Sequence, residues 1–276
     1  MKTIVNRIGI LGMIMLLIAG CSELSSDNYG TLKIDITDAP FPIDLIDSAN
    51  VTITKVEARI KGDSSGAEFT TLYEESQTFN LLELRNGVTA NMTELEVPVG
   101  EIDLIRIYVE EASLTLTNGD SYSVKVPSGS QTGIKVFINP AITIAGGLTS
   151  ELLLDFSLEK SFVLKGNMNT PAGIKGFNFK PVIRAVNNST AGTIAGVVMD
   201  TSLVALGKAS LWVEQDSIIS TAITDSTGFY AFPGLEAGSY MVSATAENHD
   251  TVTIEDVPVQ AANRTELNFE LTKLTE

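Results

Sequence analysis

Carboxylates dominate the reactive side chains of this sequence. Its 276 residues include 34 acidic and 18 basic side chains, which gives a formal charge of −16, but only one histidine and one cysteine. The lone histidine, His249, argues against His-rich metal sites and against Ser–His or Cys–His catalysis, and a solvated loop side chain is the favoured interpretation over a metal or catalytic role. The lone cysteine, Cys21, excludes an internal disulfide and a cysteine-based metal cluster. We therefore expect no bound metal and no cofactor.

The acidic charge also bears on partners and on catalysis. Phosphate binding needs clustered Lys and Arg, so a nucleic-acid partner is not expected. A glycosidase needs two carboxylates about 5–10 Å apart at the floor of a cleft. The sequence does not show such a separation, and a solvated acidic surface explains the acids without it. We therefore predict no catalytic residue and no enzymatic activity.

Four aspartates lie close together in the sequence and raise the possibility of a calcium site: Asp35, Asp38, Asp44 and Asp47. Their spacing is not that of an EF-hand loop. Aspartate side chains accept hydrogen bonds from nearby backbone N–H groups and so favour turns. Capping of turns and strand ends around Ala39-Pro40 is therefore the favoured interpretation.

Trp212 is the most informative side chain for binding. In the segment Ala209 to Glu214, a strand would place Ala209, Leu211 and Val213 on the core face and leave Trp212 on the opposite face. An exposed tryptophan on a sheet can stack on a sugar ring, and aromatic residues are enriched in binding hot spots. The favoured interpretation is that a loop or the first domain covers the ring. Trp212 is the candidate contact for a glycan.

The N-terminus carries the most specific signal. Lys2 and Arg7 precede an apolar run over residues 8–19, which is too short to span a bilayer but suits a secretory signal peptide. The run ends in Leu17-Ile18-Ala19-Gly20-Cys21, which resembles the lipoprotein box of bacteria, where the cysteine is acylated and becomes the first residue. An ordinary signal peptide followed by a chance cysteine is the alternative.

This resemblance implies a lipid-anchored protein. Residues 1–20 would be the signal peptide and residues 21–29 a polar tether, with a membrane as partner through acylated Cys21. Two or three acyl chains hold a protein on a membrane almost permanently, whereas one is marginal. Ser22 stands where an aspartate would resemble an inner-membrane retention signal, which favours the outer membrane or the cell surface.

After the tether, short alternating runs predict strands. Leu32, Ile34 and Ile36 alternate with polar residues, as in a strand with one buried face. Two longer runs change phase by one residue, which predicts β-bulges near Thr54-Lys55 and Glu110-Glu111. Closely spaced strands without crossover helices pair through hairpins and Greek keys. The predicted fold class is therefore all-β, with two antiparallel β-sandwich domains.

Several local features complete this interpretation. Asn118-Gly119-Asp120 predicts a hairpin turn. Residues 79–84 fit either a short strand or a helical turn. Further strands are predicted over the following ranges: 133–139, 152–158 and 177–186. The polar run from Asn187 to Gly192 marks a boundary, so the predicted division is an N-terminal domain over residues 30–187, a linker over 188–191 and a C-terminal domain over 192–276.

The C-terminal domain resembles the carboxypeptidase regulatory-like family, which has a prealbumin-like (transthyretin-like) sandwich also seen in Cna-B-type surface modules. The resemblance rests on residues 192–200, 209–213, 224–232 and 235–240. Within them, Gly228 suits a positive-φ turn that Asp225 can cap, and Tyr230 and Phe232 point to one face. Asn248-His249 replaces a Gly-Tyr pair common in the family, which puts one aromatic core contact in doubt.

The N-terminal domain resembles an uncharacterised family of bacterial surface lipoproteins, a domain of unknown function. The segments that carry this resemblance are residues 30–40, 105–109, 126–128, 152–157 and 179–184. The family recurs beside prealbumin-like modules, as here. The resemblance implies these boundaries and a surface location, and it gives no information on activity.

Taken together, the sequence predicts a non-catalytic, lipid-anchored envelope protein that binds or adheres to a glycan, another envelope component or a surface protein. The alternative is a structural subunit of a surface assembly such as a fimbria, built by strand addition. Four short motifs also resemble bacterial O-glycosylation sites: Asp47-Ser48-Ala49, Asp216-Ser217-Ile218, Asp225-Ser226-Thr227 and Asp250-Thr251-Val252. Their use is left open.

Overall fold

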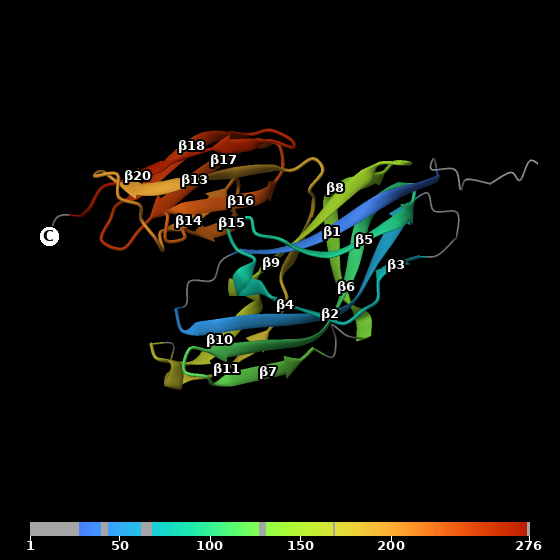
Figure 1. The fold of residues 1–276 in the computed structure, drawn as a ribbon, viewed down its shortest axis with the longest axis horizontal. Coiled ribbons are helices and arrows are strands. Elements are labelled where there is room, and N and C mark those ends of the chain that lie inside the picture. The colour runs from blue at the N-terminus through green and yellow to red at the C-terminus, as the bar shows by residue number, and fades with distance from the viewer. Residues whose placement is uncertain (1–27, 40–43, 62–67, 127–130, 168, 275–276) are drawn as a thin grey trace, which may run out of the picture.

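A computed structural model of the chain describes residues 28–39, 44–61, 68–126, 131–167 and 169–274. Cys21, the expected signal peptide over residues 1–20 and nearly all of the expected tether lie outside these residues. Figure 1 shows the described chain as two all-β bodies side by side, the first coloured blue to yellow and the second gold to red. No helix among the described residues is long and apolar enough to cross a membrane.

The first body is built on one ten-stranded sheet and a small hairpin. Its strands, in chain order, are β1 (Tyr29–Ala39), β2 (Ile46–Lys61), β3 (Thr70–Tyr73), β4 (Gln77–Asn80), β5 (Ala90–Pro98), β6 (Gly100–Leu116), β7 (Ser121–Lys125), β8 (Ile134–Ile144), β9 (Thr149–Ser157), β10 (Phe162–Gly166), β11 (Ile174–Phe179) and β12 (Ile183–Asn187). Single turns of helix lie at η2 (Leu81–Glu83), α2 (Leu158–Ser161) and η3 (Pro171–Gly173).

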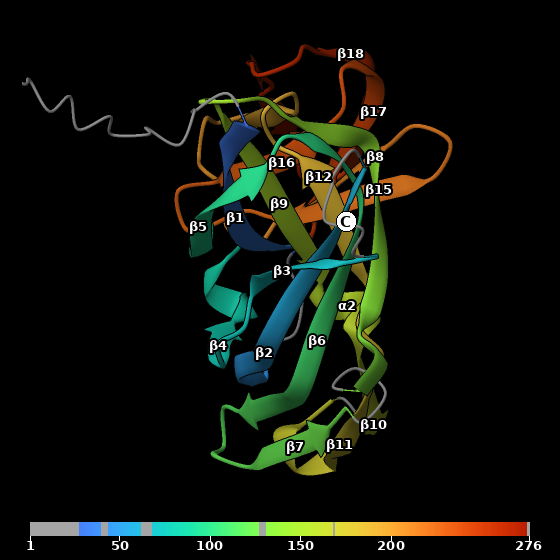
Figure 2. The same cartoon turned by 90° about the vertical axis from the view of Figure 1, so that its right-hand side faces the viewer.

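The large sheet runs in the order β3-β2-β6-β8-β12-β9-β1-β5, and β4 and β7 extend it from β2 and β6. The end strands β3 and β5 lie close together, because the sheet curls around its own core. Figure 2 shows how the long strands β2 and β6 run down from the curled part to β7, β10 and β11. In the ladder between β2 and β6, Thr54 on β2 and Glu110 on β6 form β-bulges, because they have no register partner on the other strand. These bulges confirm the predicted phase changes.

The predicted alternation also holds in the core. Leu32, Ile34 and Ile36 of β1 are fully buried, and they join one apolar cluster that fills the curled sheet. The hairpin turn at Asn118–Asp120 is confirmed, with Gly119 at a φ of 91° and the Asp120 N–H donating to Asn118 Oδ1. Residues 79–84 hold both expected structures, the end of β4 followed by the turn η2.

Two expectations need correction. Residues 177–186 do not form one strand, because Pro181 lacks an N–H for the ladder and separates β11 from β12. The all-β sandwich class is confirmed, but not every pair is antiparallel: β1–β9, β8–β12, β13–β19 and β13–β20 run parallel. These partners lie far apart in the chain, so they need neither a hairpin nor a single crossover helix.

The second body is a sandwich of two four-stranded sheets. Its strands are β13 (Gly192–Asp200), β14 (Ser210–Glu214), β15 (Ile218–Ile223), β16 (Phe229–Leu235), β17 (Gly238–Thr245), β18 (Thr251–Val259), β19 (Arg264–Glu266) and β20 (Phe269–Leu271). One sheet has the order β16-β13-β19, with β20 also on β13, and the other β15-β14-β17-β18. The rings of Tyr230 and Phe232 are fully buried between them, edge to face with centroids 5.6 Å apart.

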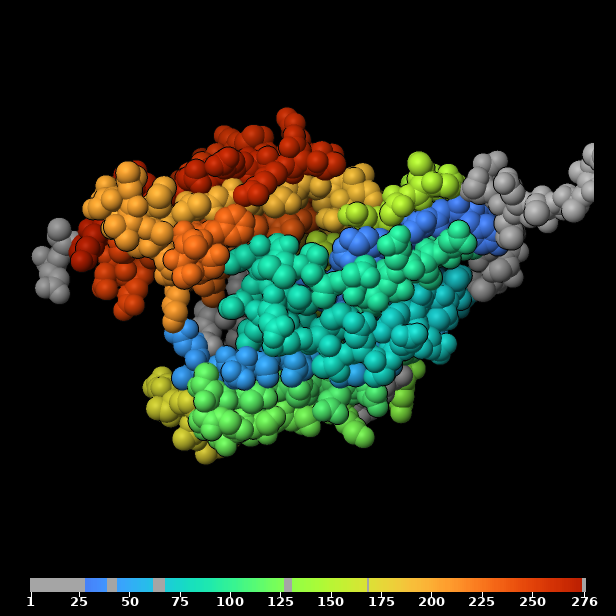
Figure 3. Space-filling model, in the orientation of Figure 1, coloured from blue at the N-terminus to red at the C-terminus, as the bar shows by residue number. Residues whose placement is uncertain are grey.

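The two bodies meet edge against face. The edge strands β15 and β16 of the second body lie against the outer face of β1, β9 and β12 in the first. Figure 3 shows the second body, orange to red, lying along one side of the first. Leu153, Val186 and Ala191 form a small buried cluster there, and Gly234 approaches Leu153 and Val186 closely. Two otherwise open sheet edges are thereby covered, which protects them from pairing with other chains.

Candidate functional site

Trp212 lies on β14, the second strand of the four-stranded sheet β15-β14-β17-β18, on the outward side of that sheet. Ala209, Leu211 and Val213 are buried, as predicted, and Trp212 is half-buried on the other face of β14. Its register partners are Thr221 on β15 and Ser243 on β17. The ring is therefore flanked on both sides by hydroxyl side chains.

Hydroxyl groups extend across this face of the sheet. By strand register, the Trp212 face comprises Trp212 with the hydroxyl residues Ser210, Thr221, Ser243, Thr245, Thr251 and Thr253, and it also carries Ile223, Glu214 and Met241. Ser243 and Thr253 share a hydrogen bond of 2.8 Å between their hydroxyl oxygens. Thr251 and Thr253 are exposed, whereas Ser243 is buried. A flat array of hydroxyls around one indole offers both stacking and hydrogen bonding to a polar ring.

The four aspartates considered for calcium do not converge, and three of them have separate partners. Asp35 accepts from Asn91 and pairs with Lys33 at 2.7 Å. Asp44 pairs with Lys208 of the second body at 2.9 Å, while the carboxylate of Asp38 accepts the backbone N–H of Leu158 at the start of α2. Asp47 is exposed. Among the described residues, no group of three or more His, Cys, Asp or Glu side chains could hold a metal ion.

Two carboxyl groups of the first body, Asp38 and Asp155, have pKa values raised by burial. Burial, with a smaller contribution from the charge of Asp155, raises the pKa of Asp38 well above its usual value, and its Oδ2 has no hydrogen-bond partner in the described part of the chain. Burial also raises the pKa of Asp155, against the opposing charge of Arg184. Arg184 donates to Asp155 Oδ2 at 2.7 and 3.1 Å and to the Gly234 carbonyl at 2.8 Å.

Asp155 also borders a cavity of about 100 Å³ between the two bodies. This is well below the roughly 300 Å³ at which typical ligand pockets begin. The acid therefore serves the contact between the bodies, through Arg184.

Other residues named from the sequence lie on the surface. His249 is in a turn, with its Nδ1 2.8 Å from the Glu247 carbonyl. Of the candidate O-glycosylation hydroxyls, Ser217, Ser226 and Thr251 are exposed and Ser48 is half-buried. Glycosylation of these residues stays a prediction, as does acylation of Cys21.

A groove between the two bodies was not predicted. This interdomain groove has a volume of about 690 Å³. Its polar and aromatic lining includes Asn86, Glu151, Asn188 and Ser189 of the first body and Phe229 and Arg264 of the second. Only the Asn86-Gly87 dipeptide carries a local signal, for a tight turn. The groove itself arises from the packing of one body on the other, which no local pattern records.

The comparisons with known proteins follow this division of the chain. Residues 29–181 match the family described as "Domain of unknown function (DUF4382)". The chain belongs to this family. Residues 193–272 match the carboxypeptidase regulatory-like domain, in agreement with the resemblance found in the sequence. No curated protein matches the chain.

Solved structures give weak likenesses. The shaft pilin SpaA of Lactobacillus rhamnosus GG is 9% identical, with 89% of this chain and 99% of that chain covered and a TM-score of 0.27. The minor pilin GBS52 of Streptococcus agalactiae is 10% identical, with 88% and 97% covered and a TM-score of 0.25. A cohesin–X-dockerin complex of Acetivibrio cellulolyticus is 24% identical over 29% of this chain, with a TM-score of 0.24; the match spans 56% of that chain.

Proposed function

We propose that the chain is a non-catalytic, lipid-anchored protein of the bacterial cell envelope that binds a glycan on the Trp212 face. The observation that carries this proposal is the half-buried indole set between hydroxyl side chains on an outward sheet face. Sugar rings present C–H groups that stack on aromatic faces and hydroxyls that exchange hydrogen bonds with Ser and Thr.

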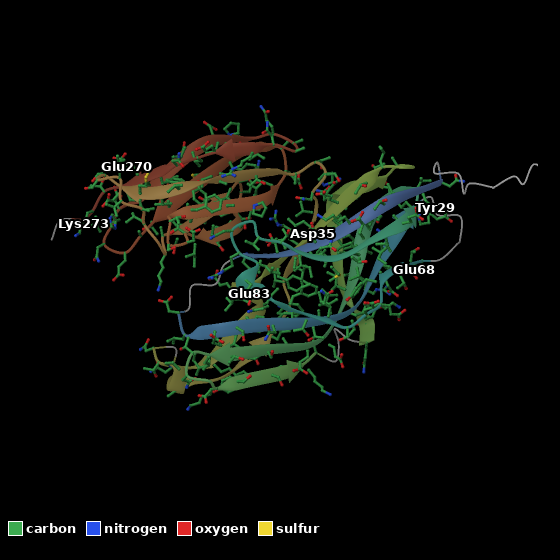
Figure 4. The ribbon with its side chains drawn as sticks, viewed as in Figure 1. Tyr29, Asp35, Glu68, Glu83, Glu270 and Lys273 are labelled. Atoms are coloured by element: carbon green, nitrogen blue, oxygen red, sulfur yellow. The ribbon has the colours of Figure 1, made fainter. Side chains whose placement is uncertain are left out.

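The arrangement of the described chain supports an anchored binding protein. Figure 4 places Tyr29 at one end of the molecule and Lys273 near the other. If Cys21 is acylated, the eight residues from Cys21 to Asn28 span at most about 29 Å, at 3.6 Å per residue. The end with Tyr29 would then lie next to the membrane, and the second body would extend away from it toward its ligand.

The Trp212 face is tested by its aromatic residue. Trp212→Ala should abolish retention of the purified chain on immobilised cell-envelope polysaccharides, because the stacking surface is lost. Phe137→Ala is the matched control, since Phe137 is 69% exposed on β8 in the first body and its loss should leave retention unchanged. Equal retention of Trp212→Ala and the parent chain would refute the proposed site.

The anchor, the lack of catalysis and the structural-subunit alternative need their own measurements. A fatty-acid probe should label the parent chain in cells and not the Cys21→Ser variant. Incubation of a bound polysaccharide with the chain should release no new reducing ends. Gel filtration should give a monomer, and spontaneous polymerisation would instead support the structural-subunit alternative.

A further inference from the structure

The interdomain groove has the size and place of a ligand site. Its volume of about 690 Å³ falls within the roughly 300–1,000 Å³ typical of such sites, which are common at domain boundaries. One side is made by the start of β9 and by turns of the first body, and the other by the outer face of β13, β16 and β19. The groove shares no residue with the Trp212 face.

Small side chains make up most of the apolar lining. Ala195 and Ala231 are register partners on β13 and β16, and Ala262 lies beside them in the groove. No Leu, Ile, Val or Met of the described chain lines it; Phe229 is the one large apolar side chain there. Ala195 and Ala231 are buried, so the apolar surface open to a ligand comes mainly from exposed Ala262 and half-buried Phe229. The flat C–H face of a sugar ring can pack on such a surface.

The facing wall from the first body is rich in amides and hydroxyls. Asn188 Nδ2 donates to Glu151 Oε2 at 2.9 Å, and the Glu151 N–H donates to Ser189 Oγ at 2.8 Å. Asn86, with a φ of 54°, donates from Nδ2 to the Ile223 carbonyl at 2.8 Å. Its Oδ1 is buried and has no hydrogen-bond partner within the described residues.

Among the described residues that line the groove, Arg264 on the opposite wall is the one cation and Glu151 on the facing wall is the one carboxylate. The Arg264 guanidinium lies 5.7 Å from the centre of the Phe229 ring. In the part of the chain that the structure describes, Arg264 forms no ion pair. By contrast, three arginines of the first body, Arg59, Arg106 and Arg184, each pair with an acidic side chain. Arginine matches a carboxylate in shape and charge through two parallel hydrogen bonds.

We propose that the interdomain groove binds an acidic oligosaccharide, with Arg264 paired to a sugar carboxylate and with Ala262 and Phe229 under the sugar ring. The amides and hydroxyls of the first body hydrogen-bond the sugar hydroxyls. Because the chain carries a formal charge of −16, its overall field repels anions. Binding of an acidic sugar therefore reports a specific site and not general charge attraction.

Oligogalacturonates, with maltohexaose as the neutral counterpart, are suitable probes for isothermal titration calorimetry on the full chain in detergent. The parent chain should bind hexagalacturonate more tightly than maltohexaose. Arg264→Gln should weaken hexagalacturonate binding about tenfold or more, as expected for the loss of a charge-assisted hydrogen bond. Lys273→Gln is the matched control, because it removes the same charge from an exposed residue outside the groove and should bind like the parent.

A second variant tests the groove independently of its charge. Thr149 is exposed at the start of β9 and lines the groove, so Thr149→Trp should obstruct it and weaken hexagalacturonate binding while leaving the melting temperature nearly unchanged. Trp212→Ala should bind hexagalacturonate like the parent, which separates this site from the Trp212 face. The proposal is overturned if the parent chain does not bind hexagalacturonate, if Arg264→Gln binds it equally well, or if a glutamate-rich peptide binds through Arg264 in its place.

Discussion

The two bodies differ in the polar groups that they bury. Among the described residues, the buried carboxylates all belong to the first body: Asp35, Asp38, Glu57 and Asp155. The second body buries only hydroxyls as polar side chains: Ser220, Thr224 and Ser243. A buried hydroxyl needs one or two hydrogen bonds, whereas a buried carboxylate also needs a compensating charge. The first body should therefore depend on its ion pairs and on pH, and the second on apolar packing.

The buried carboxylates are not equally compensated. Glu57 contacts Lys55, Arg106 and the Tyr108 hydroxyl, and the hydrogen bonds and charges of these groups lower its pKa although burial alone would raise it. Asp38 has one donor, the N–H of Leu158. The comparison thus predicts that Asp38 is a cost to folding at neutral pH and that Glu57 is not.

The largest expected effect is on the apolar core of the second body. Phe232→Ala removes a fully buried ring that packs on Tyr230, and it should lower the free energy of unfolding by about 3–5 kcal/mol. Calorimetry should then show a transition of the second body well below that of the first. The exposed Phe137 supplies the control, with Phe137→Ala within about 0.5 kcal/mol of the parent. A single common transition would show instead that the contact between the bodies makes them unfold together.

Removing the cation of the interbody contact should have the next largest effect. Arg184→Ala leaves the buried Asp155 without its partner and deletes the bond to the Gly234 carbonyl, at an expected cost of about 3 kcal/mol. Urea denaturation measures this cost. The double variant Asp155→Asn with Arg184→Ala should recover part of the loss, because no charge then remains buried. No recovery would mean that the arginine acts through the carbonyl bond alone.

Asp38→Asn should give a smaller effect that depends on pH. The pKa of Asp38 is higher in the folded chain than in the unfolded chain, chiefly through burial, so the folded state holds this proton more tightly. Its contribution to stability is therefore full below the unfolded pKa and falls as pH rises toward the folded pKa. Asparagine does not ionise, so the variant should gain stability relative to the parent between pH 4 and pH 8 in urea denaturation. Of the charged groups around it, Asp155 adds to this effect and Arg85 opposes it. An unchanged difference across that range would contradict the prediction.

The opposite sign is expected for an acid of the second body, with the smallest effect. The Thr227 hydroxyl, together with the N–H groups of Thr227 and Phe229, lowers the pKa of Asp225. Its stabilisation is present above the unfolded pKa and is lost as pH falls through the folded pKa. Asp225→Asn should therefore cost about 1 kcal/mol at pH 7, the net value of one hydrogen bond, and less at pH 3. Thermal melting at the two pH values measures the difference, and an equal cost at both would argue against it.

Local patterns were sufficient for much of the second body. The alternation in β14, the shared face of Tyr230 and Phe232, and the turn at Gly228, with its φ of 77°, follow from residue type and spacing and are present in the structure. In the first body, the bulges at Thr54 and Glu110 were equally readable, because a phase change in the apolar pattern is a local signal.

Long-range pairing was beyond such patterns. The parallel pairing of β1 with β9 joins Thr31 to Thr149, more than a hundred residues away, and no spacing rule encodes it. The interdomain groove depends on the same kind of contact, since Asn86 reaches Ile223 and Arg264 faces the groove only after the bodies have packed. The sequence does distinguish Trp212 by its type and face, whereas Arg264 is one exposed arginine in an acidic chain.

The position of β1 has a mechanical consequence. This strand follows directly after the expected tether, and it is hydrogen-bonded along its length to β5 on one side and to β9 on the other. A force applied to the chain before Tyr29 would act along β1. The hydrogen bonds of both ladders would then be loaded in parallel, and many of them would have to break at the same time for β1 to move. Shear of this kind resists extension far better than peeling from an end, which would suit the first strand after the proposed anchor.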